Sequence, residues 1–86
     1  MSRGVLKTTG RSVRLSEASM GREYVVVSIN CNGVVKRRIL DMGIIPGAKI
    51  RVLRTAPLGD PLEVIVSGFP ISIRKSEAAC IEVIER

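Results

Sequence analysis

The sequence predicts a small, mainly β fold: an antiparallel barrel of five short strands with one short helix inserted after the first strand. Three observations favour it. The chain has 86 residues, enough for one modest core. It is 45% hydrophobic but has only one Tyr, one Phe and no Trp, so the core must come from aliphatic side chains that suit strands. Gly, Pro and Asn residues divide the chain into short segments.

Five segments alternate between apolar and polar side chains in the way that strands do. They cover residues 23–29, 49–54, 62–67, 71–74 and 81–85. In the first of them, Val25, Val27 and Ile29 share one face. Between the third and the fourth, Gly68 and Pro70 indicate a turn.

One segment has the period of a helix. In residues 34–42, VVKRRILDM, apolar side chains recur at the spacing of one helix face. Asn32 suits the N-cap of this helix and Gly43 its C-terminal end. We expect the helix to cover one end of the barrel, and a single further helical turn at residues 76–80 with Ser76 as its cap. The helical side chains expected in or near the core are Ile39, Leu40 and Met42.

The positive charge of the chain is concentrated near its N-terminus. The net charge is +6, but residues 1–14 hold four basic residues and no acidic one. We therefore interpret residues 1–14 as a flexible basic leader and residues 15–86 as the folded domain. The chain lacks a signal peptide and an apolar run of membrane-spanning length, so we expect a cytoplasmic protein without direct membrane insertion. In that compartment Cys31 and Cys80 are expected to be free thiols.

The residue inventory argues against catalysis and metal binding. There is no histidine, which excludes Ser–His and Cys–His pairs and removes a common metal ligand. Cys31 and Cys80 have no CxxC spacing, and only Asp60 and Glu63 lie near each other as oxygen ligands. We expect no enzyme, no cofactor and no metal site in this chain alone. A metal site shared between protomers stays open.

The loop in TAPLGDPLEV, residues 55–64, is a candidate binding surface. It lacks the GxxxxGK[ST] pattern and leads into no helix, so it is not a phosphate-binding loop. Turn chemistry explains its prolines and its Gly–Asp pair, but it does not explain a leucine at the tip. We expect a docking surface for a partner protein here. Its candidate residues are Pro57, Leu58, Gly59, Asp60 and Pro61, together with Phe69 and Pro70.

A nucleic-acid-binding barrel is the alternative function. Lys36, Arg37, Arg38 and the leader supply positive charge for it. Single-strand binders rely on aromatic stacking platforms, however, and Tyr24 and Phe69 are too few for one. The body of the chain is also nearly neutral. We therefore favour a protein partner and expect no nucleic acid.

Three motifs follow one another along the domain: RRILDMGIIPG (residues 37–47), APLGDPLEV (56–64) and ISIRKSEAACIEV (71–83). Their order and spacing resemble the family of ferrous iron transport protein A, FeoA. The resemblance covers residues 15–86, with isoleucine in place of the family's leucine at positions 39 and 73. The matching residues are Arg38, Gly43, Pro46, Gly47, Ala56 to Pro61, Arg74, Ala78, Ile81 and Val83.

The resemblance implies an SH3-like fold, in agreement with the small barrel. It also implies a cytosolic accessory or regulatory protein of ferrous iron uptake, one that contacts the cytosolic part of the membrane transporter FeoB. We expect a monomer or a weakly self-associating homo-oligomer. For Arg38 we favour a structural role, with its guanidinium bonded to a turn carbonyl, and keep partner contact as the alternative.

Overall fold

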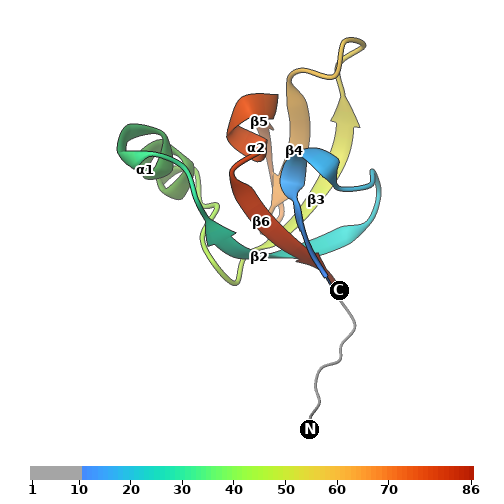
Figure 1. Cartoon of the computed structure of the whole chain (residues 1–86). Helices are drawn as coiled ribbons and strands as arrows, with labels where there is room; N and C mark the ends of the chain where they lie inside the picture. The colour runs from blue at the N-terminus through green and yellow to red at the C-terminus, as the bar shows by residue number, and fades with distance from the viewer. Residues whose placement is uncertain (1–10) are drawn as a thin grey trace, which may run out of the picture.

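One antiparallel sheet of six strands, strongly bent, makes up the body of the molecule (Figure 1). The computed structural model describes residues 11–86. The strand order is β1-β6-β2-β3-β4-β5. The strands are β1 (Ser12–Arg14), β2 (Glu23–Ile29), β3 (Lys49–Thr55), β4 (Leu62–Val66), β5 (Phe69–Ile73) and β6 (Ile81–Glu85). The helices are the 3₁₀ turn η2 (Leu15–Glu17), α1 (Gly33–Asp41) and the short α2 (Lys75–Ala78). The mainly β fold with one short helix after the first long strand is confirmed.

The first strand lies inside the predicted leader. Ser12, Val13 and Arg14 pair with β6 in antiparallel register, so the sheet begins before residue 15. In Figure 1 this strand runs beside β6. Three residues are too few for an alternating pattern to be seen, and their partner strand lies at the far end of the chain. Residues 1–10, the rest of the predicted leader, lie outside the described residues.

Alternation of side chains predicted the buried face well in β3 and β4 and poorly in β2. Ile50 and Val52 are buried, whereas their neighbours Lys49, Arg51 and Leu53 are exposed. In β2 the pairing with β6 shifts between Val26 and Ser28, which is the mark of a β-bulge. The extra residue breaks the period of two. Of the three side chains predicted to share a face there, only Ile29 is buried.

The turn between β4 and β5 is tighter than predicted. Ser67 and Gly68 alone form it, both with positive φ (50° and 92°), as a two-residue hairpin requires. Phe69 and Pro70, predicted to lie in this turn, are the first residues of β5. Proline fits there because β5 lies at the edge of the sheet formed by residues 11–86.

Helix α1 lies beside the barrel and does not cover its end (Figure 1). It is anchored through Ile39, which is fully buried, whereas Leu40 is exposed and Met42 half-buried. Asn32 occupies the N-cap position, but its side chain makes no capping hydrogen bond. Gly43 has a φ of 90° and ends the helix as predicted. No helix within residues 11–86 is long and apolar enough to cross a membrane.

Candidate docking surface beside helix α2

A groove separates α1 from the corner where β5 leads into α2. It consists of two adjoining hollows of about 540 and 410 Å³, and Arg38, Arg74 and Glu77 line both. The first hollow extends to Asp60 and Pro61 of the loop between β3 and β4. The second extends to the two cysteines. We call these two hollows together the α1–α2 groove.

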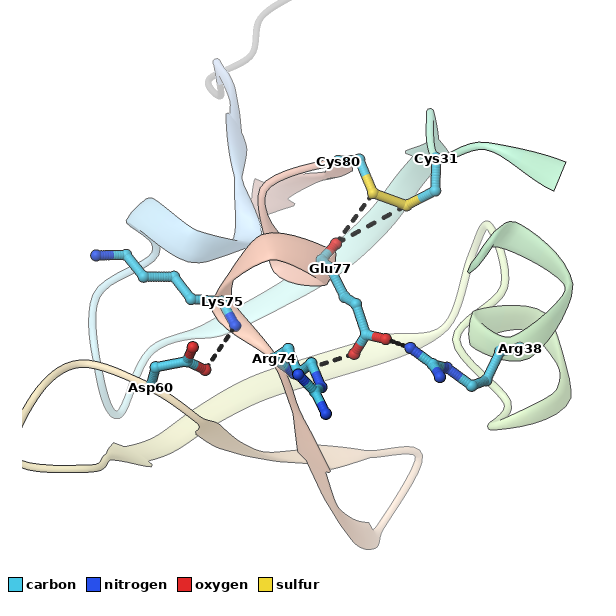
Figure 2. Close-up of polar contacts among 7 residues, drawn as sticks. All are labelled: Cys31, Arg38, Asp60, Arg74, Lys75, Glu77 and Cys80. Atoms are coloured by element: carbon cyan, nitrogen blue, oxygen red, sulfur yellow. Dashed lines mark hydrogen bonds and ion pairs between the residues drawn. A yellow bond between two sulfur atoms is a disulfide. The ribbon is translucent and has the colours of Figure 1, made fainter. Parts of the chain in front are cut away.

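Glu77 forms the floor of the groove and holds its two walls together (Figure 2). The residue is only 6% exposed, and a buried carboxylate requires partners. One oxygen, Oε1, accepts a hydrogen bond from the backbone N–H of Arg74 at 3.0 Å. The other, Oε2, forms an ion pair with the guanidinium of Arg38, which reaches across from α1. Arg38 therefore has a structural contact, but with a carboxylate of α2 and not with the turn carbonyl that we expected.

The first turn of α2 is capped by Arg74, which is one of the motif residues, and by Glu77, which the motif comparison did not single out. The N-cap is Arg74 and not Ser76, because the helix starts at Lys75. Glu77 follows Arg74 by three residues, the spacing at which a glutamate bonds back to the N-cap N–H. A capping box is recognised in a sequence from Ser or Thr at the N-cap, so the arginine at this position gave no signal for the role of Glu77.

Asp60 links the loop between β3 and β4 to α2. Its Oδ1 accepts a hydrogen bond from the backbone N–H of Lys75 at 2.9 Å (Figure 2). This N–H belongs to the first turn of the helix, where backbone donors lack partners within the helix. Asp60, predicted as a docking residue, therefore has a structural role that fixes the loop against the groove.

The tip of this loop is Leu58. The chain closes on either side of it through two backbone hydrogen bonds, from Gly59 N–H to Ala56 O at 2.7 Å and from Ala56 N–H to Pro61 O at 3.0 Å. Gly59 has a φ of 86°, which favours glycine. Leu58 is 95% exposed, and Pro57 is exposed beside it. The loop thus presents a leucine that packs against nothing within residues 11–86.

Phe69 and Pro70 do not join Leu58 in one surface. Phe69 pairs with Val66 at one end of β4, whereas the loop with Leu58 enters β4 at Leu62, the other end. The four residue steps between them span about 13 Å along the strand. Phe69 is 71% exposed, so it is a separate apolar side chain at the opposite end of the β4–β5 hairpin.

Cys31 and Cys80 form a disulfide, which corrects the expectation of free thiols. Their Cα atoms are 5.1 Å apart although the residues are 49 positions apart in the sequence. Cys31 precedes α1 and Cys80 follows α2, so the bridge ties the two walls of the groove together at one end (Figure 2). The pairing depends on long-range proximity and has no signal in the local sequence.

The lining of the groove contains Arg38, Arg74, Asp60 and Glu77, so its formal charges balance, but only one of the two arginines is paired. Within residues 11–86, the guanidinium of Arg74 has no ion-pair partner, whereas Arg38 is paired with Glu77.

Away from the groove, a hydrogen bond from Arg22 to Glu85 and the charge of that carboxylate raise the pKa of Arg22 above its ordinary value. No set of three or more Cys, Asp or Glu residues in the described part of the chain is placed to hold a metal ion.

Comparison with known proteins places this geometry in a family. Residues 13–85 match the model of the FeoA domain. A fusion protein from Porphyromonas gingivalis, which joins Fe(2+) transport protein A to the Fe(2+) transporter FeoB, is 41% identical over 71 residues. That match covers 83% of this chain but only 8% of the fusion protein, so the chain spans a small part of that relative.

Two solved structures are similar over most of the chain. The FeoA protein from Chlorobium tepidum has a TM-score of 0.77 and 44% sequence identity, covering 83% of this chain and 68% of its own. FeoA from Stenotrophomonas maltophilia, a zinc complex described as a prokaryotic SH3-domain protein, has a TM-score of 0.70 and 32% identity. It covers 80% of this chain and 86% of its own. The fold is therefore SH3-like, and the chain belongs to the FeoA family.

Proposed function

We propose that this chain is an accessory binding protein of ferrous iron transport and acts by contact with the cytosolic part of FeoB. The observation that carries the proposal is the P. gingivalis relative, in which a segment 41% identical to this chain is part of the same polypeptide as FeoB. Fusion holds two partners at a high effective concentration, which favours their association. A separate chain of the same family needs a docking surface of its own to associate with FeoB.

The loop that presents Leu58 is the docking surface we propose. Its two closing hydrogen bonds and the bond from Lys75 to Asp60 fix the loop before binding, so little conformational entropy is lost on association. Burying a leucine that is 95% exposed contributes roughly 1.5–3 kcal/mol. Pro57 and Gly59 flank it. Arg38 and Arg74, on the adjoining groove, supply charge for acidic or carbonyl groups of the partner.

The proposed role in iron transport is binding alone. Any effect of this chain on transport comes from unequal affinity for different states of FeoB. The S. maltophilia relative, for which a role as a ferrous iron transport activating factor has been suggested, supports a role of this kind.

The proposal is tested by titrating the cytosolic part of the cognate FeoB with the wild-type chain and two variants. Leu58→Asp removes the apolar tip, and Phe69→Asp is the matched control, an exposed apolar residue at the opposite end of the hairpin. We expect Leu58→Asp to weaken binding by about tenfold or more, equivalent to ~1.4 kcal/mol, and Phe69→Asp to leave it unchanged. Circular dichroism checks that both variants fold.

Binding to FeoB and binding through the loop with Leu58 would be contradicted by different results. If the wild-type chain does not bind FeoB at physiological salt, the proposed function is wrong. If it binds and Leu58→Asp binds equally well, the loop is not the interface. A parallel titration with single-stranded and duplex DNA tests the alternative function, a nucleic-acid-binding barrel. Binding through phosphate contacts would have an affinity that falls steeply as the salt concentration rises.

A further inference from the structure

The disulfide lies at the surface of the groove and not inside the core. Cys31 and Cys80 are both half-buried, and both line the hollow of about 410 Å³. The neighbours Asn30, Asn32 and Ser76 are exposed and polar. Thiol–disulfide exchange needs a thiolate to reach a sulfur atom, and this open hollow provides such access.

The same geometry suits the reduced thiols. The carbonyl oxygen of Glu77 lies 3.2 Å from Sγ of Cys80 and 3.8 Å from Sγ of Cys31 (Figure 2). A disulfide has no hydrogen to donate, but each thiol would meet an acceptor already in place after reduction. Reduction therefore needs no rearrangement of α2.

Helix α1 has contacts with the rest of the fold that do not involve the disulfide. After reduction, α1 is still held by the buried side chain of Ile39 and by the ion pair between Arg38 and Glu77. Arg38, Arg74 and Glu77 line the hollow together with both cysteines. Because Arg38 is paired with Glu77, Arg74 is the cation of this hollow that is free to attract an incoming thiolate.

From these observations we propose that Cys31–Cys80 is a reversible redox site whose substrate class is a dithiol reductant. A thiolate of the reductant attacks one of the two sulfur atoms, forms a mixed disulfide and releases the other cysteine as a thiolate, which takes up a proton. The second thiol of the reductant then attacks the mixed disulfide and releases the remaining cysteine. The protein gains two electrons and two protons, and the reductant becomes a disulfide.

The redox state controls how firmly the start of α1 is attached to α2. In the oxidised chain the segment before α1 is covalently tied to the residue after α2. In the reduced chain the hydrogen bond from Asn30 N–H to Cys80 O at 2.7 Å remains, and the first side chain of α1 that packs against the core is Val35. Reduction thus loosens one end of the groove and leaves the barrel and the loop with Leu58 in place.

A redox titration of the full chain tests the proposal without any partner. The chain is equilibrated in mixtures of reduced and oxidised dithiothreitol, and then of glutathione, and its thiols are trapped with N-ethylmaleimide for mass spectrometry. We expect no label in the oxidised chain, two labels per chain in the reduced chain, and full recovery of the bridge on return to oxidising buffer. The midpoint should fall in the range of cellular thiol couples.

Hydrogen exchange provides the second measurement. We expect reduction to cause a loss of protection in residues 30–37 and no change in residues 62–66 of β4. The variant with both Cys31→Ser and Cys80→Ser is the control, and it should show the exchange pattern of the reduced wild type. Cysteines that label without reductant, or a bridge that stays closed to reductant until the chain unfolds, would overturn the proposal. Equal exchange in both redox states would overturn the effect on α1.

Discussion

The ion pair between Arg38 and Glu77 is the contact whose removal is most informative, because it joins α1 to α2 across the groove. A double-mutant cycle with Arg38→Gln, Glu77→Gln and the double variant isolates its energy. Glutamine at position 77 keeps a carbonyl oxygen to accept the bond from Arg74 N–H, so that bond is retained in the cycle.

The expected magnitude follows from the exposure of the two side chains. The Glu77 side chain is 8% exposed and the Arg38 side chain 58%. Hydrogen bonds to charged groups contribute ~1.5–3 kcal/mol when protected from water, and exposed ion pairs ~0.2–1 kcal/mol. This pair lies between those limits, so we expect a coupling energy of about 1–2 kcal/mol. Arg38→Gln alone should cost more than Glu77→Gln alone, because it leaves a buried carboxylate without its counter-ion.

The assay is urea unfolding followed by circular dichroism, with the disulfide kept oxidised in every variant. The pair between Arg54 and Glu63 on the barrel surface provides the matched control, at 3.0 Å with side chains 69% and 50% exposed. The same cycle there should give less than about 0.5 kcal/mol. A coupling for Arg38 and Glu77 no larger than that of the control would refute the view that this pair holds the groove together.

The remaining predictions concern the helix anchor, the bridge and the loop. Ile39→Ala should lower the free energy of unfolding by about 2–5 kcal/mol, because Ile39 is the fully buried side chain of α1; urea unfolding measures it, and a loss below ~1 kcal/mol would contradict the anchoring role. Replacing Cys31 and Cys80 together by serine should cost about 4 kcal/mol, since the bridge spans 49 positions and restricts the unfolded chain; equal unfolding midpoints with and without the bridge would disprove it. Leu58→Asp should change stability by no more than ~0.5 kcal/mol because the side chain is 95% exposed, and a larger loss would show that the leucine packs against the domain.

Local patterns were sufficient for much of the fold. Ile50 and Val52 in β3 alternate with basic residues, and their burial follows from the period of two. The end of α1 at Gly43 follows from the preference of glycine for positive φ. The exposure of Leu58 was also predicted, because turn chemistry explained its neighbours and left the leucine without a partner.

The remaining features depend on contacts between distant segments. The bulge in β2 is defined by its pairing with β6 at the other end of the chain. The bond from Lys75 to Asp60 and the ion pair of Glu77 likewise join residues from separate elements.

The turn between β4 and β5 was misplaced for a local reason, since Ser67 adopts the positive φ that the sequence indicates only for a glycine.

The central claim, that this chain docks onto the cytosolic part of FeoB through the loop at Leu58, is tested most directly by a nuclear magnetic resonance titration. Isotope-labelled chain is titrated with the unlabelled cytosolic part of the cognate FeoB, and the amide shifts of the chain are followed. The account predicts changes in residues 58–60, between the two prolines that have no amide hydrogen, and along the groove at Arg38 and Arg74, with none at Phe69. Changes confined to Phe69 and the turn beside it, or no changes at saturating FeoB, would contradict it.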